Sequence, residues 1–202
     1  MKINQILLLL LSTLMGSSLE YPDHNQSDNW VTLYENDIWV GYTETPNIDW
    51  CRTISRLPFS LDRISTMIED LENYYQIFDR VTSSKIITND VVHIRIDMPF
   101  PISDRDYIVR YTANKTGNNI SYKFQAADDI SIEINDSCIR LVNAAGEWYL
   151  RSIDDVTTEV IYTWNGELRG DFPSWALTRA WETQGLEMIN WLRESLEKKY
   201  KE

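Results

Sequence analysis

The fold of this chain is decided by the stretch Pro99-Phe100-Pro101-Ile102-Ser103-Asp104-Arg105-Asp106-Tyr107-Ile108-Val109. From its end onward, large apolar or aromatic residues alternate with the residues between them. Because successive side chains of a strand point to opposite faces, the alternation predicts a strand with Tyr107, Val109 and Tyr111 on one face and Asp106, Ile108 and Arg110 on the other. The quoted stretch therefore leads into a strand.

The segments on both sides of this strand show the same period of two. Residues 91–98 predict a strand with Val92, Ile94, Ile96 and Met98 on one face and His93, Arg95 and Asp97 on the other, and residues 120–126 place Ile120, Tyr122, Phe124 and Ala126 on one face. Further runs typical of strands cover residues 30–34, 38–43, 51–57, 139–150 and 157–164. Short turns separate the later runs, which predicts one large antiparallel sheet.

Helical spacing occurs twice. Between residues 60 and 78, apolar residues recur every three or four positions, which predicts one helix or two short ones. The longest periodic segment follows Pro173, and its apolar stripe consists of Leu177, Ala180, Trp181, Gln184, Met188, Leu192 and Leu196. One long C-terminal helix is thus expected to lie on the sheet, in a single α+β domain.

The chain has 202 residues, and its first 18 resemble a cleaved signal peptide. Lys2 precedes a short apolar run, which ends at small residues. A polar N-terminal tail is expected over residues 19–29 and the folded domain over residues 30–200. The mature protein is expected to be exported, to the periplasm or the extracellular space. Export permits a disulfide, but the sequence leaves open whether Cys51 and Cys138 form one or are two buried thiols.

The chain is acidic, with 31 Asp and Glu against 19 Lys and Arg and a net charge of −12. Such a field repels phosphate backbones and anionic lipid surfaces, so no nucleic-acid partner is expected. Any membrane contact would be apolar and transient. Nothing in the sequence requires an oligomer, and a monomer is expected.

Residues that do catalysis are scarce. His24 lies in the polar tail and His93 on the polar face of its strand, where a solvated histidine is the expectation. The pairs Asp128-Asp129 and Asp154-Asp155 fall in expected turns and are expected to be solvated. No phosphate-binding, metal-binding or nucleophile motif is present, so no catalytic residue, cofactor or metal is expected. The aromatic residues, 12% of the chain, fit either a solid core or a ligand cavity between sheet and helix.

Several segments resemble the StAR-related lipid-transfer (START) domains. The stretch 99–107 is similar to their "P-x-P-x-S-x-R-D-aromatic" motif. Arg140 with residues 146–150, the run 158–162 and residues 170–175 resemble three later motifs in the same order. The resemblance covers about residues 28–200.

The resemblance implies a helix-grip fold: a strongly curved antiparallel sheet wrapped around the C-terminal helix, with an internal hydrophobic cavity for one lipid. The residues expected to line this cavity are Val92, Ile94, Ile96, Tyr107, Val109, Tyr111, Tyr122, Phe124, Leu177, Trp181, Gln184 and Met188. A gate loop is expected at Ile130, Ile132 and Ile134, with an ordinary edge strand as the alternative. Structural roles are expected for Arg105, Asp106, Pro173 and Trp175. Because some family members carry a charge where Tyr111 stands, its phenol suggests recognition through a hydroxyl, or none.

The function that follows is binding, and transfer or shielding, of a lipid or another hydrophobic small molecule by a protein that is not an enzyme. Two alternatives stay open. Helix-grip relatives include cyclases and hydratases, which would require an ionisable pair facing the cavity. A ligand-sensing interaction module would require a surface that a partner reads.

Overall fold

The computed structural model describes residues 19–25, 29–133, 138–170 and 172–200. A ten-stranded sheet dominates it, with neighbouring strands in the order β1-β2-β3-β10-β9-β7-β6-β5-β4, and β8 pairs with β6 off this path. All pairs are antiparallel except β6 with β8. Most of the order follows the short hairpins, whereas the pairings of β3 with β10, of β7 with β9 and of β6 with β8 join strands distant in sequence.

The elements have the following bounds: β1 Val31–Glu35, β2 Ile38–Thr43, β3 Trp50–Leu57, α1 Leu61–Glu69, the 3-10 helix η1 Leu71–Asn73, α2 Tyr74–Ile77, β4 Val81–Ile86, β5 Val91–Ile96, β6 Asp104–Thr116, β7 Asn119–Ala126, β8 Cys138–Arg140, β9 Ala145–Ser152, β10 Thr158–Asn165, the 3-10 helix η2 Ser174–Ala176 and α3 Leu177–Tyr200. Among the described residues, no helix is both long and apolar enough to cross a membrane.

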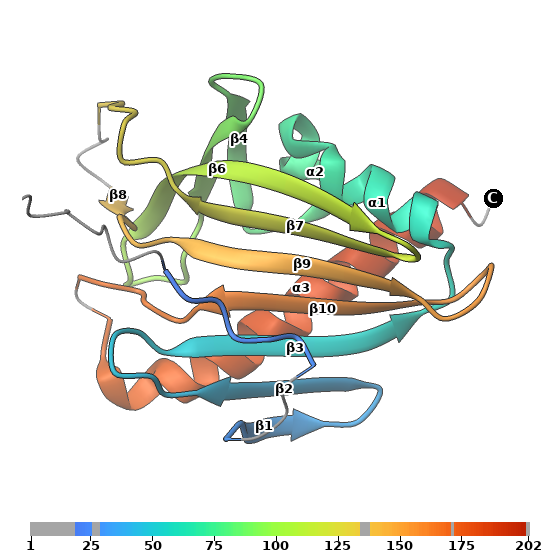
Figure 1. The fold of residues 1–202 in the computed structure, drawn as a ribbon. Helices are drawn as coiled ribbons and strands as arrows, with labels where there is room; N and C mark the ends of the chain where they lie inside the picture. The colour runs from blue at the N-terminus through green and yellow to red at the C-terminus, as the bar shows by residue number, and fades with distance from the viewer. Residues whose placement is uncertain (1–18, 26–28, 134–137, 171, 201–202) are drawn as a thin grey trace, which may run out of the picture.

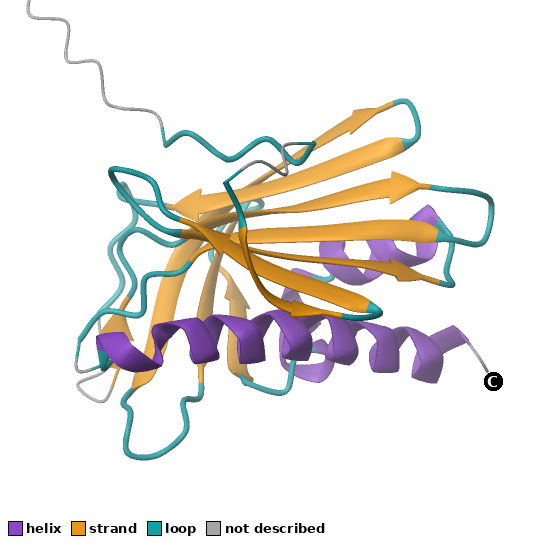
Figure 2. Ribbon diagram, turned by 90° about the horizontal axis from the view of Figure 1, so that it is seen from below, coloured by secondary structure: helices purple, strands orange, loops and turns teal. Residues whose placement is uncertain are grey.

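The 24-residue helix α3 runs along one face of the curved sheet, which we call the inner face (Figures 1 and 2). The helices α1 and α2 cover the same face beside it. Buried residues of α3, including Ile189, Leu192 and Leu196, contribute to one continuous core with the inward side chains of the strands. The predicted α+β fold, a curved antiparallel sheet around a long C-terminal helix, is confirmed.

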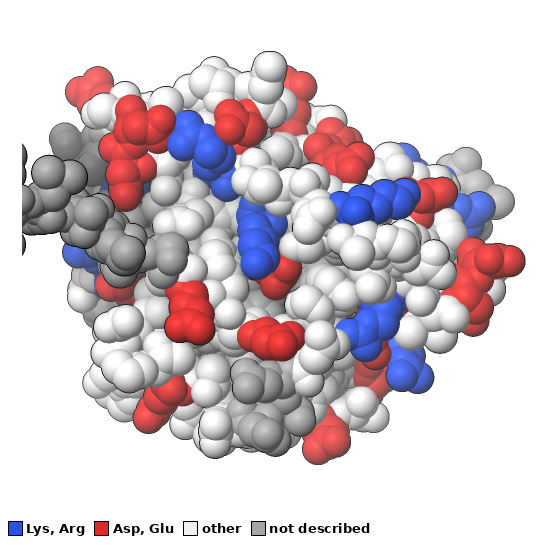
Figure 3. All heavy atoms as spheres, in the orientation of Figure 1, with Lys and Arg blue, Asp and Glu red and all other residues white. Residues whose placement is uncertain are grey.

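The outer face of the sheet carries charged side chains of both signs. In the space-filling view of this face, acidic and basic side chains alternate over the strands without a continuous basic area (Figure 3). Ion pairs on the surface, such as that of Arg110 with Asp129, follow the same pattern. This distribution agrees with a surface that does not attract polyanions.

Residues 19–25, which belong to the polar tail expected over residues 19–29, lie across the outer face of the sheet (Figure 1). The Tyr21 hydroxyl donates to the carbonyl oxygen of Phe124 at 2.8 Å. Arg52 is only 2% exposed, and its Nη2 donates to two carbonyl oxygens of the segment at 3.1 Å. The sequence predicts a tail here because the segment is polar and its hydrogen-bond partners lie in β3 and β7, far along the chain.

The same segment should respond to pH through His24, whose ring stacks on Tyr149 with 3.6 Å between centroids. Burial lowers the pKa of His24, although Glu147 and Asp23 act in the opposite direction. A lowered pKa means that the stacked, neutral form stabilises the segment above about pH 6.5 and that this contribution is lost as the pH falls below it. Hydrogen exchange of residues 19–25, corrected for intrinsic rates, is expected to be faster at pH 5 than at pH 7.5.

The variant His24→Phe keeps a stacked ring without a titratable nitrogen. It should therefore show the same protection of the segment at both pH values. An equal loss of protection at pH 5 in this variant and in the wild type would contradict the role given to His24.

The expected single strand over residues 139–150 is wrong. The chain forms the short β8, turns, and starts again as β9. Arg140 in β8 binds Asp106, which keeps β8 beside β6, and the Ala144 amide donates to the Leu141 carbonyl oxygen in the turn. Cys51 and Cys138 are both buried and free, as the simpler of the two interpretations predicted.

Candidate functional site

A pocket of about 520 Å³ lies between α3 and the inner face of the sheet. Its wall is largely aromatic, because β6, β7, β9 and β10 each direct alternate large rings inward. Within this wall Trp148 stacks on Tyr162 with 4.1 Å between ring centroids, and Tyr162 on Trp164 with 5.0 Å. The aromatic residues that line the pocket are Tyr74, Phe78, Tyr107, Tyr111, Phe124, Trp148, Tyr162, Trp164, Phe172, Trp175 and Trp191.

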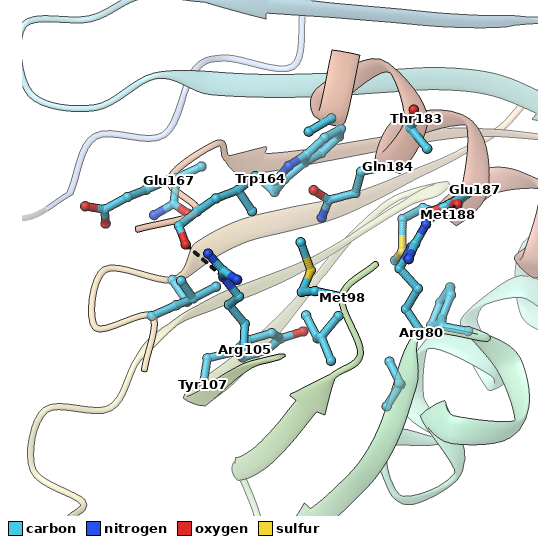
Figure 4. Close-up of a pocket in the computed structure, with 18 of the residues that line it drawn as sticks. Arg80, Met98, Arg105, Tyr107, Trp164, Glu167, Thr183, Gln184, Glu187 and Met188 are labelled. Atoms are coloured by element: carbon cyan, nitrogen blue, oxygen red, sulfur yellow. Dashed lines mark hydrogen bonds and ion pairs between the residues drawn. The ribbon is translucent and has the colours of Figure 1, made fainter. Parts of the chain in front are cut away.

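Six of the residues predicted to line a cavity are brought together in this pocket. They come from β5, β6, β7 and α3, and they are Ile96, Tyr107, Tyr111, Phe124, Gln184 and Met188. Figure 4 shows Tyr107, Gln184 and Met188 around the same space. Period-two and helical spacing found these residues because each of them lies on the inward side of its element.

The other six predicted lining residues do not reach this pocket. Four inward strand residues belong instead to the solid core that α1 and α2 cover, and they are Val92, Ile94, Val109 and Tyr122. Leu177 and Trp181 line a separate hollow of about 370 Å³ beside residues 45–49. The inner face is thus divided: helices fill one part of it, and only the remainder is open.

The expected gate loop does not lie over the pocket. Ile130 and Ile132 pack against Val91, Ile108 and Ala127, on the side of β5 and β6 away from the core. Ile134 lies outside the described residues.

The rim of the pocket lies at the segment before α3 and at the stretch before β6. The segment that leads into α3 contributes Trp175, which is 85% exposed, and Pro99 and Ile102 of the opening stretch also line the pocket. Pro173 is predicted to open the last helix. In the structure it precedes the short helix η2, and α3 begins directly after η2. Trp175, expected to be structural, is therefore a rim residue.

Arg105 connects the start of β6 to the segment before α3. The side chain is 1% exposed, and its guanidinium donates to the carbonyl oxygens of Ser103, Leu168 at 3.0 Å and Arg169 at 2.9 Å. Its stem lines the pocket. These bonds agree with the structural role expected for Arg105.

Asp106 points to the opposite side of β6 and holds a buried ionic cluster. Its carboxylate accepts from Arg140 Nε at 2.8 Å and Nη2 at 2.6 Å, and it lies 2.8 Å from His93 Nε2. Burial raises the pKa of Asp106, but the hydrogen bonds from Arg140 and His93 outweigh it and the pKa is lowered. The expectation of a solvated His93 is wrong, because β5 pairs with β6 and places its ring against this carboxylate.

The charged residues that line the pocket were not predicted from the sequence. Arg80, just before β4, forms a bidentate ion pair with Glu187 of α3, with both N–O distances at 2.7 Å. Both side chains line the pocket (Figure 4). Glu187 lies off the apolar stripe, so the sequence predicts a solvated side chain. Its position next to Met188 and one turn from Gln184 could have indicated a place near the pocket, but its ion-pair partner depends on the tertiary structure.

No known family model matches the chain. The uncharacterized protein PA1579 of Pseudomonas aeruginosa is 31% identical over 180 residues, which are 86% of this chain and 89% of that protein.

Solved structures share the fold. A STAR-related lipid transfer protein from Xanthomonas axonopodis has a TM-score of 0.73 and 22% identity, covering 84% of this chain and 99% of its own. Human STARD10 has a TM-score of 0.77 and 12% identity over 92% and 86% of the two chains. The Zhui aromatase/cyclase from Streptomyces, with a TM-score of 0.54 and 16% identity, covers 73% of this chain and 93% of its own. At these identities the likeness shows the fold alone.

Proposed function

Because this chain belongs to one family with the uncharacterized Pseudomonas protein and has the helix-grip fold of START domains, we propose that it binds one lipid or other hydrophobic small molecule in the pocket under α3. The observation that carries the proposal is the aromatic pocket itself. Its volume of about 520 Å³ lies within the roughly 300–1,000 Å³ of small-molecule sites. Each Å² of apolar ligand surface that enters it contributes about 25 cal/mol to binding.

We propose that the protein acts in the periplasm or the extracellular space, as a carrier that shields its ligand from water. The support is the sequence of residues 1–18, which lie outside the described part of the chain. The surface charge supports the same role, since an acidic coat keeps a carrier of apolar cargo soluble.

Binding rather than acid–base catalysis is favoured by the state of the ionisable groups that line the pocket. Arg80 and Glu187 neutralise each other, and Arg105 donates to backbone carbonyl oxygens. Burial raises the pKa of Tyr107 and of Tyr162, so neither phenol is a base near neutral pH. If the protein were an enzyme, it would resemble the Zhui aromatase/cyclase, which shares this fold.

The direct test is to identify what leaves the protein with organic solvent. The full chain is expressed with its own N-terminus, recovered from the compartment it reaches, and measured intact by native mass spectrometry. We expect one hydrophobic molecule per chain. A protein that carries none, and takes up none from mixed lipid vesicles, would contradict the proposal.

A variant that fills the pocket makes the test specific. Ala180 of α3 lines the pocket and is half-buried, so Ala180→Phe should occupy space that the ligand needs and lower its occupancy at least tenfold. The matched control is Ala113→Phe on an exposed stretch of β6. The control should bind as the wild type does. Equal ligand occupancy in the two variants would place the ligand elsewhere.

A further inference from the structure

Two tyrosine hydroxyls on the pocket wall are without a protein partner. Tyr107 comes from β6 and Tyr162 from β10, and both line the pocket. Within the described residues, neither hydroxyl donates to or accepts from another group. Tyr162 is only 6% exposed as a residue and its ring lies against the pocket, so a molecule in the pocket is the partner within reach of its hydroxyl.

Nearby tyrosines show that the chain satisfies its other buried phenols. The Tyr74 hydroxyl donates to the Ile68 carbonyl oxygen at 2.7 Å. Tyr122 donates to Glu69 at 2.6 Å. Recognition through the hydroxyl of Tyr111 stays a prediction, and Tyr107 and Tyr162 offer two further hydroxyls without a described protein partner.

A third polar group faces the same space from the helix. The side-chain amide of Gln184 lines the pocket from α3 and makes no hydrogen bond to another described residue. In Figure 4 Gln184 and Tyr107 approach the pocket from opposite sides, with Met98 between them. Tyr162 lines the same pocket from β10. The three groups together form a set of hydrogen-bond donors around one apolar space.

The charges around the pocket argue for a ligand without net charge. Arg80 and Glu187 are held by each other in a bidentate pair. Glu167 accepts from Asn143 Nδ2 at 2.9 Å. Arg179, which is exposed, also lines the pocket and has no ion-pair partner among the described residues. A charged ligand group placed away from Arg179 would have to be desolvated at a cost that the paired side chains do not offset.

From these contacts we propose that the pocket selects a neutral apolar molecule that carries an oxygen acceptor, such as a carbonyl, which accepts from Tyr107, Tyr162 and Gln184. The proposal rests on the function proposed above and narrows its ligand class. A pure hydrocarbon would leave these donors unsatisfied, whereas a carboxylate beside them would lose its hydration for hydrogen bonds to neutral groups. Tyr107 and Tyr162 are thus specificity-determining residues, while the aromatic wall supplies affinity.

The test compares ligands that share a skeleton and differ only in their polar group. The delipidated full chain is titrated, by native mass spectrometry, with heptadecane, 9-heptadecanone and heptadecanoic acid, and with 5α-cholestane, 5α-cholestan-3-one and 5α-cholestane-3β-carboxylic acid. For the skeleton that binds, the ketone is expected to bind about threefold to tenfold more tightly than the hydrocarbon for each hydrogen bond it makes. It should also bind more tightly than the acid.

Variants assign the effect to residues. Tyr107→Phe and Tyr162→Phe remove one oxygen each and should weaken ketone binding by about threefold to tenfold while leaving hydrocarbon binding unchanged. Tyr75→Phe, at an exposed position of α2, is the matched control and should change neither. Equal affinity for ketone and hydrocarbon, a preference for the acid, or Phe variants that bind the ketone as the wild type does would overturn the proposed ligand class alone. Failure of all six compounds to bind would count against the proposed function itself.

Discussion

Replacing Arg105 with methionine is expected to lower the free energy of unfolding by about 4 kcal/mol, because a buried carbonyl oxygen that loses its donor costs about 1–3 kcal/mol. Arg105 donates to the carbonyl oxygens of Ser103, Leu168 and Arg169, and those bonds hold the segment before α3 against the start of β6. For a chain of this size we expect a fall in Tm of about 8–16 °C. Urea unfolding followed by circular dichroism measures the change.

The control for this substitution lies on the same strand. Arg110 pairs with Asp90 and Asp129 at the surface, where its side chain is 39% exposed. Exposed ion pairs contribute about 0–1 kcal/mol, so Arg110→Met should be nearly neutral. If the two variants lose similar stability, Arg105 does not tie the strand to the helix entry.

The second large effect is expected at Asp106. Asp106→Asn keeps the shape of the side chain but removes the charge that Arg140 and His93 contact, and we expect a loss of about 3 kcal/mol. Asp129→Asn, which affects an exposed ion pair whose carboxylate is 63% exposed, should be nearly neutral. Chemical unfolding at neutral pH compares the two.

The same carboxylate has a pH signature. Because the pKa of folded Asp106 is lowered, its contribution is complete above the unfolded value of about 4 and is lost as the pH falls below it. The stability difference between the wild type and Asp106→Asn should therefore shrink in acid. A difference that stays constant from pH 7 to pH 3 would show that the charge of Asp106 is not what the variant removes.

Much of the fold was predictable because the sheet is built from local patterns. Alternation placed Val92 and Ile94 inward and His93 outward, and β5 has this arrangement. The stripe on α3 named Gln184 and Met188, which line the pocket. What alternation does not give is the neighbour across the sheet. The outward His93 is therefore not solvated, because β6 brings Asp106 beside it.

The pocket was less predictable for a related reason. Inward strand residues are equivalent in sequence, yet Ile96 lines the pocket while Ile94 is in the solid core under the short helices. The ion pair of Arg80 with Glu187 joins residues 107 positions apart, and neither position is distinctive by itself. The packed segment 19–25 depends in the same way on partners from distant strands.

The amino-acid sequence by itself determined most of the strands, though not β4 or the break between β8 and β9, together with the long C-terminal helix and the face to which most side chains point, because these follow from periods of two and 3.6 residues along the backbone. Only the tertiary structure decided where the inner face stays open and which polar groups there lack a partner. Those features depend on how far the sheet curves and which elements cover it. Ile94 and Ile96 share one face of β5, yet only Ile96 lines the pocket, and only the fold shows that the Tyr107 hydroxyl there has no described protein partner.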